Sequence, residues 1–268
     1  MGQKVSGELC SASADDTMDG AQSPQQPPPT MILMPSCIRK GTSKRSRIVS
    51  MAITDLTGSK QSKLDFLLDR RRSDDVNDLQ LANSWSPVDR STCIRVRRDD
   101  PLTFRRLPVQ GTTDAIRAKV GYSRGLHAWT IRWKSDQRGS HAVVGVATAQ
   151  APLQQIGYKC LVGGNAETWG WDLVKNRLWH NGRSHPGVMC LAENGHNLLE
   201  RTASIPDDIT VILDMDAGTM EFAIEGHYLG VAFTGLKGKT LYPAVSAVWG
   251  HCEVTIRYIG SIERKSST

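Results

Sequence analysis

The chain has 268 residues, a length that suits one large all-β domain with a tail, or two small domains. Hydrophobic residues make up 39% of it and charged residues 22%, which excludes a collagen, a coiled coil and wholesale disorder. The net charge of +6 is too mild and too dispersed for a nucleic-acid-binding protein.

Residues 1–63 are predicted to be a disordered N-terminal region. All but one of the Phe, Trp and Tyr residues lie at or after Trp85, and aromatic side chains supply much of the burial that offsets chain entropy. Residues 22–36 are rich in proline, which is typical of an extended linker and, less often, of an SH3 or WW ligand. Residues 39–47 are strongly basic, which suits a nuclear signal, a membrane-binding run or a solvated segment.

The opening Met-Gly-Gln-Lys-Val-Ser fits the pattern for N-terminal myristoylation of Gly2, a pattern that also arises by chance. One acyl chain holds a membrane only weakly, so a stable anchor needs a second signal, which residues 39–47 would supply. A membrane-tethered scaffold is therefore an alternative function. No apolar stretch is long enough to span a membrane and no signal peptide is recognisable, so a cytoplasmic location is expected, with weak membrane association or nuclear entry as variants.

Between Ile94 and Arg124, eight basic side chains outnumber three acidic ones. Such an excess suits either a solvated face or a patch for an acidic peptide partner, and the sequence leaves both interpretations open.

From residue 126 onward the pattern predicts antiparallel strands. Residues 126–133 alternate with a period of two, and residues 141–148 form an apolar run typical of a strand buried on both faces. Gly-containing turns join three later strands into two hairpins, and a last strand alternates from Cys252 to Tyr258. Many short strands without a long helix predict a β-sandwich. The residues expected to share one face of the first strand are His127, Trp129, Ile131 and Trp133.

No catalytic or metal-binding constellation is recognisable, so a binding protein without a cofactor is expected rather than an enzyme. The six cysteines contain no CxxC pair, which is typical of reduced intracellular thiols. His180 and His185 have no matching pair for zinc. Residues 214–225 resemble a calcium loop only in part, because the glycine stands one position early and the following residues alternate as a strand.

Five segments go beyond the fold class and resemble the SPRY (B30.2) domain of the SPRY-domain SOCS-box proteins. They are TDAIRAKVGY (113–122), QRGSHAVVGVAT (137–148), ETWGWDL (167–173), LDMD (213–216) and GLKGKTLYPAVSAVWGHC (235–252). The resemblance covers residues 64–260 and implies a bent sandwich of two antiparallel sheets, on which residues 64–79 pack as an N-terminal extension.

The resemblance also implies a function. In the family, loops at one end of the sandwich form a pocket for an Asp-x-Asn-Asn-Asn type peptide, and a SOCS box recruits elongins B and C and a cullin, so that the bound protein is ubiquitinated and degraded by the proteasome. The implied peptide-binding residues are Arg106, Pro108, Val109, Gln110, Gly139, Ser140, Tyr158, Leu161, Val248, Trp249 and Gly250.

These residue types suit an amide-rich ligand. Arg106 is expected to donate to a carboxylate or carbonyl, the two glycines to expose backbone, and the two aromatic residues to form flat walls. The competing interpretation is that Tyr158 and Trp249 are ordinary core residues. Gln110 departs from the family, which has a small residue there, and this affects the expected peptide affinity.

After the last predicted strand, residues 261–268 are too few to form the helices of a SOCS box. The sequence is therefore interpreted as a substrate-recognition domain without the SOCS box that recruits the ligase. It would arise as an isoform, a truncation or a diverged form. Such a chain would compete with complete family members, and would engage elongins and a cullin only if a SOCS box exists in a full-length form.

Overall fold

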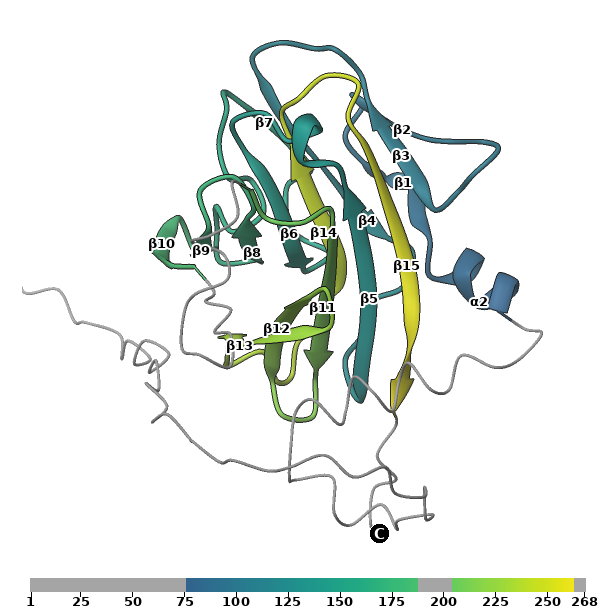
Figure 1. Ribbon diagram of the computed structural model, residues 1–268, viewed down its shortest axis with the longest axis vertical. Coiled ribbons are helices and arrows are strands. Elements are labelled where there is room, and N and C mark those ends of the chain that lie inside the picture. Colours follow the sequence, from purple (N-terminus) through teal and green to yellow (C-terminus); the bar gives the residue numbers. More distant parts are fainter. Residues whose placement is uncertain (1–75, 188–203, 263–268) are drawn as a thin grey trace, which may run out of the picture. The chain divides into compact units, whose positions relative to one another are not determined.

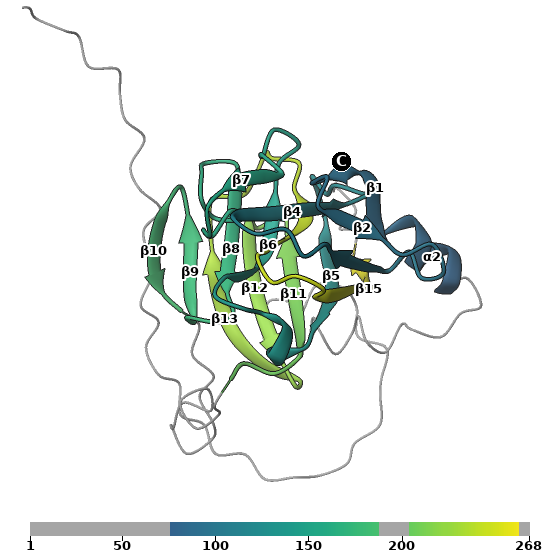
Figure 2. The ribbon, with the colours of Figure 1, turned by 90° about the horizontal axis from the view of Figure 1, so that it is seen from above.

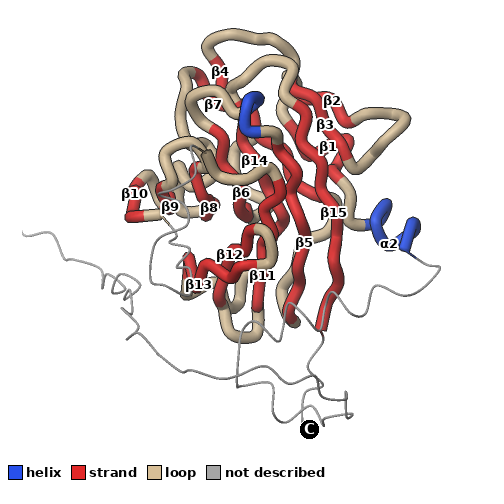
Figure 3. Tube along the Cα trace, in the orientation of Figure 1, coloured by secondary structure: helices blue, strands red, loops and turns tan. Residues whose placement is uncertain are grey.

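The computed structural model describes residues 76–187 and 204–262. In these ranges the chain forms two antiparallel β-sheets, a short helix α2 (Val76–Ala82) and a 3-10 turn η2 (Ser135–Gln137) (Figure 1). Strands dominate the trace in Figure 3. The predicted β-sandwich of two antiparallel sheets is confirmed.

The first sheet contains eight strands, with β7 paired to the start of β4. In spatial order they are β1 (Trp85–Arg90), β4 (Thr112–Ala118), β14 (Tyr242–Ala247), β6 (Ala142–Ala147), β8 (Thr168–Asp172), β9 (Arg177–His180) and β10 (Arg183–Pro186), beside β7 (Gln154–Ile156).

The second sheet contains seven strands. In spatial order they are β13 (His227–Phe233), β12 (Thr219–Ile224), β11 (Asp208–Asp214), β5 (Leu126–Trp133), β15 (Glu253–Ile262), β3 (Thr103–Arg106) and β2 (Ile94–Val96).

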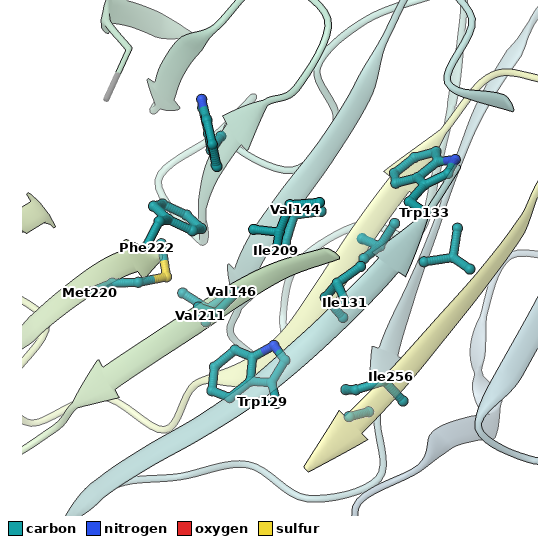
Figure 4. Packing of buried hydrophobic residues seen from close by; sticks show 14 of the residues in the cluster. Trp129, Ile131, Trp133, Val144, Val146, Ile209, Val211, Met220, Phe222 and Ile256 are labelled. Atoms are coloured by element: carbon teal, nitrogen blue, oxygen red, sulfur yellow. The ribbon is translucent and has the colours of Figure 1, made fainter. Parts of the chain in front are cut away.

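The inner faces of the two sheets share one apolar core. Trp129, Ile131 and Trp133 of β5 are buried, together with Val144 and Val146 of β6 (Figure 4). The period of two in β5 thus directs three of the four predicted residues into the core. His127 is only half-buried; its ring stacks on Tyr122, with centroids 3.8 Å apart.

Strand β6 is buried on both faces, as its apolar run predicts. Its inner side chains join the main core, while Val143 and Ala147 on the outer face pack in a second cluster with Ala151, Leu161 and Val162. The connection between β6 and β8 supplies these three residues. The connection between β6 and β8 therefore covers the outer face of β6.

Helix α2 is fixed to β15 by one side-chain amide. Gln80 Nε2 donates to the carbonyl of Tyr258 at 2.6 Å, and the backbone N–H of Tyr258 donates to Gln80 Oε1 at 2.9 Å.

Strand β15 extends to Ile262, slightly past the domain boundary predicted at residue 260. Residues 1–63, with Gly2 and the proline-rich and basic segments, lie outside the described residues, as do residues 64–75 of the predicted extension. Among the residues described, no helix is long and apolar enough to cross a membrane.

Gly145 of β6 lies opposite Gly170 of β8, and a Cβ at position 145 would overlap the carbonyl oxygen of Trp169. We therefore expect Gly145→Ala to destabilise the fold by about 3 kcal/mol, because the obstacle is backbone in a packed interior. The matched control is Gly226→Ala, in a turn with open space, which should cost only about 1 kcal/mol for its positive φ. Urea unfolding of the two variants measures the difference, and equal losses would contradict the steric explanation.

Candidate peptide-binding site

Four connections meet at one end of the sandwich. They are residues 107–111 between β3 and β4, 138–141 between η2 and β6, 157–161 after β7, and 248–252 between β14 and β15. Figure 1 shows the β3–β4 and β14–β15 connections and η2 at its upper end, and Figure 2 looks onto that end. Three close contacts join these connections, and each involves a glycine.

The first contact joins residues 107–111 to the β14–β15 connection. A Cβ at Gly250 would lie 2.8 Å from Cα of Pro108, so only glycine permits this backbone approach. Two backbone hydrogen bonds secure it: Arg106 N–H donates to the carbonyl of Cys252 at 3.1 Å, and His251 N–H donates to that of Arg106 at 2.8 Å.

The second contact places Trp249 on Gly139. Gly139 has φ +62°, and a Cβ there would lie 3.1 Å from the Trp249 ring. Because the glycine leaves this space, the indole rests against backbone while 51% of the residue stays exposed.

The third contact holds Tyr158. Its hydroxyl accepts a hydrogen bond from the N–H of Gly111 at 3.1 Å, and the N–H of Gly157 donates to the carbonyl of Gly111 at 2.8 Å. Tyr158 is 49% exposed. Tyr158 and Trp249 are the only strongly exposed aromatic residues in the described part of the chain, which excludes the core interpretation for both.

Arg106, which is expected from the sequence to donate to a ligand, does not present its side chain to solvent. It is fully buried, and its guanidinium pairs with Asp114, Nη2 to Oδ2 at 2.7 Å and Nε to Oδ2 at 2.8 Å. The same guanidinium also donates to the carbonyls of Leu107, Val109 and Thr112. Since Nε, Nη1 and Nη2 all donate within the fold, the guanidinium of Arg106 positions the 107–111 loop.

Asp114 is the matching acceptor and was not singled out as a site residue by the sequence. Its two oxygens accept from the Ser91 and Thr112 hydroxyls and the Gln154 amide as well as from Arg106. Burial alone would raise the pKa of this carboxyl, but the three neutral donors and the Arg106 charge together lower it. The folded protein therefore keeps a charged carboxylate beneath the loop.

The remaining predicted residues divide by exposure. Pro108, Val109, Gln110 and Ser140 lie at the surface, whereas Leu161 and Val248 are buried. Leu161 is only 1% exposed and packs below the surface in the cluster that covers β6. The structure thus brings the predicted residues to one end and separates a surface set from a supporting set.

The two buried cysteines near the site are held as unreactive thiols, and the neighbouring His141 is biased toward its neutral form. Burial raises the pKa of the Cys252 and Cys160 thiols to about 12, so both are protonated at neutral pH. Burial and the nearby Lys175 charge lower the pKa of His141, whose Nδ1 lies 3.0 Å from Ser140 Oγ. No cluster of three or more potential metal ligands occurs in the described residues.

Three of the residues considered for metal binding, His180, Asp214 and Asp216, have structural partners. His180 stacks on Trp169, with ring centroids 4.5 Å apart, and its Nδ1 lies 2.9 Å from the carbonyl of Thr168. Asp214 and Asp216 accept backbone hydrogen bonds from Ala217 and Gly125, which fixes the turn before β12.

Comparison with known proteins gives one consistent result. The SPRY domain model matches residues 126–259. The chain is 51% identical over 219 residues to human SPRY domain-containing SOCS box protein 1, covering 81% of this chain and 78% of that protein. It is 50% identical over 206 residues to protein gustavus of Drosophila melanogaster, covering 76% and 71%. Among solved structures, the TRIM65 PSpry domain matches with a TM-score of 0.50 at 18% identity, covering 73% of this chain and 97% of that one.

The buried ion pair predicts a specific dependence of stability on pH. Asp114→Asn leaves the Arg106 charge buried without its partner, so we expect a loss of about 3 kcal/mol at pH 7. Because the folded-state pKa of Asp114 is lowered, its contribution is present above the unfolded pKa of about 4 and is lost as pH falls further. The stability difference between wild type and variant should therefore shrink below about pH 4. Urea unfolding at several pH values checks this, and a constant difference would contradict it.

Proposed function

Because the chain belongs to the family of SPRY domain-containing SOCS box proteins, we propose that it is a non-catalytic adaptor that captures short peptide segments of other proteins. The observation that carries the proposal is two half-exposed aromatic residues at one end of the sandwich: Trp249, which packs on Gly139, and Tyr158, whose hydroxyl accepts from the N–H of Gly111. An exposed aromatic pair held in place is the usual anchor of a recognition surface.

We propose as its ligand the Asp-x-Asn-Asn-Asn type of peptide. The Asn side chains need paired donors and acceptors, and exposed polar groups of Gln110 and Ser140 lie on this end. Gly139 and Gly250 support the site indirectly, because the space of a Cβ at each is taken by Trp249 and Pro108, respectively. The loops are also fixed in advance by the contacts described above, which lowers the entropy lost on binding.

In this proposal the captured protein is a substrate for ubiquitination. The family name includes a SOCS box, whose expected partners are elongins B and C and a cullin. The SPRY domain would select the target and the SOCS box of a full-length form would connect it to the ligase. A chain that carries only the selecting part would compete with complete members for the same targets.

The aromatic residues provide the direct test of peptide capture. Trp249→Ala and Tyr158→Ala should each weaken binding of an Asp-Ile-Asn-Asn-Asn peptide by about tenfold or more, since central aromatic anchors carry about 2 kcal/mol or more. Neither should unfold the protein, because both residues are half-exposed. Calorimetric titration measures the affinity, with circular dichroism to verify the fold. The control is Val231→Ala on β13, an exposed apolar residue outside the site. Unchanged affinity in both aromatic variants would refute the site.

The connection to the ligase is tested separately. Residues 1–262, which contain the SPRY domain, should capture the peptide-bearing target but not elongins B and C from a mixture of purified components, because in this proposal the SPRY domain selects the target and the SOCS box recruits the elongins. Appending the SOCS box of a family member to the same chain is the matched control and should restore capture of the elongins. Robust capture of the elongins by residues 1–262 without a SOCS box would contradict this division of roles.

A further inference from the structure

Two of the basic side chains in residues 94–124 are neutralised by ion pairs inside the folded protein. Arg106 and Arg117 are buried and paired with Asp114 and Asp89, respectively, so their charges are compensated inside the protein. What remains on the surface near the candidate site is a smaller group, Arg95 and Arg105, with Arg90 beside them.

Arg95 and Arg105 form a cross-strand pair of like charges. They are register partners in β2 and β3, and both are exposed, while their neighbours Ile94 and Arg106 are buried. Directly opposed side chains on one face lie about 5 Å apart at Cβ, and like charges in such a pair destabilise the sheet. An anion placed between the two guanidinium groups would remove that repulsion.

No carboxylate of the described residues compensates this pair. Arg95 donates to backbone carbonyls, and so does Arg90, which bonds the carbonyl of Ile94 at 2.6 Å. The pKa of Arg90 is lowered by burial and by the Arg95 charge, as expected where cations are crowded. Glu253 is the other register partner of Arg105, but its carboxylate pairs with Arg97 at 3.5 Å.

The arginine pair adjoins the candidate site. Arg105 Nη2 lies 2.7 Å from Nδ1 of His251, the residue that follows Gly250, and Arg105 precedes Arg106 at the start of the 107–111 loop. A peptide that lies over Pro108 and Trp249 therefore needs only a short continuation to reach the guanidinium groups. The imidazole of His251 adds no negative charge.

We propose that Arg95 and Arg105, with Arg90, form an acidic-flank subsite: they bind acidic residues that lie outside the five-residue core in the same peptide ligand. The inference rests on the proposed peptide-binding function and deepens it, because it selects targets in which the Asn-rich core has Asp or Glu beside it. Arginine suits this role because its planar donors bind carboxylates in pairs. Exposed charges of this kind also steer an acidic segment toward the site before contact.

The test is a double-mutant cycle between protein and peptide. Three peptides share the core Asp-Ile-Asn-Asn-Asn: one has Glu-Glu-Glu before it, one has Glu-Glu-Glu after it, and one has Gln in all these flanking positions. We expect at least one acidic peptide to bind the wild type about three- to tenfold more tightly than the Gln peptide in low salt. This advantage should vanish in Arg95→Gln/Arg105→Gln and should shrink in about 0.5 M salt.

The matched control is Arg257→Gln. Arg257 is exposed on the same outer face of the second sheet but lies further along β15, about 13 Å beyond Glu253 at the strand spacing of about 3.3 Å per residue. It should leave the preference for the acidic flank intact.

The outcomes separate the two proposals. If no peptide binds the wild type, the proposed function fails. If the core binds but wild type and double variant show the same affinities for acidic and Gln flanks, the subsite is wrong while peptide capture stands. If the double variant weakens the Gln peptide as much as the acidic ones, the arginines support the loop and do not recognise charge, which also overturns the inference.

Discussion

The buried ion pair between Arg106 and Asp114 is the interaction on which the rest of the site depends. Arg106 ends a strand of the second sheet and Asp114 lies in a strand of the first, so the pair joins the two sheets at their loop end. Burying two charges is costly unless each donor and acceptor finds a partner. Here the guanidinium meets that condition by binding the carbonyls of the 107–111 loop, and the carboxylate by binding Ser91 and Gln154. Because the buried guanidinium needs these carbonyl acceptors, it fixes the conformation of the 107–111 loop.

This constraint explains how the exposed loops of the candidate site are held in place. The pair fixes the 107–111 loop, the loop packs Pro108 on Gly250, and the N–H of Gly111 holds Tyr158 by its hydroxyl. On the other side, Trp249 rests on Gly139. Neighbouring arginines thus have different tasks. Arg106, whose charge is paired with Asp114, is structural. Arg105 lies one residue earlier on the opposite face of the strand, and its charge stays available at the surface.

The predictable part of the fold consists of strands whose burial follows simple patterns. Strand β5 alternates and β6 is uniformly apolar, and both form where the sequence predicts. Strand β4 does not show a simple hydrophobic period, since it is buried on both faces and its buried residues include Thr113, Asp114 and Arg117. Polar residues in a sequence normally indicate a solvent-exposed position. A strand that buries polar residues in ion pairs and hydrogen bonds is therefore not recognised from its hydrophobic pattern. The very short β2 and β7 have too few residues to show a period.

The sequence by itself determined the all-β class, the alternating core strands and, through the ordered segments that resemble a known family, the set of loops that form the candidate site. Only the tertiary structure decided what each residue does there. Arg106 and Leu161 lie below the surface and Tyr158 and Trp249 lie on it. Local sequence cannot make this distinction, because exposure and charge compensation arise from partners on other strands. Arg106 is structural only because folding places Asp114 against it.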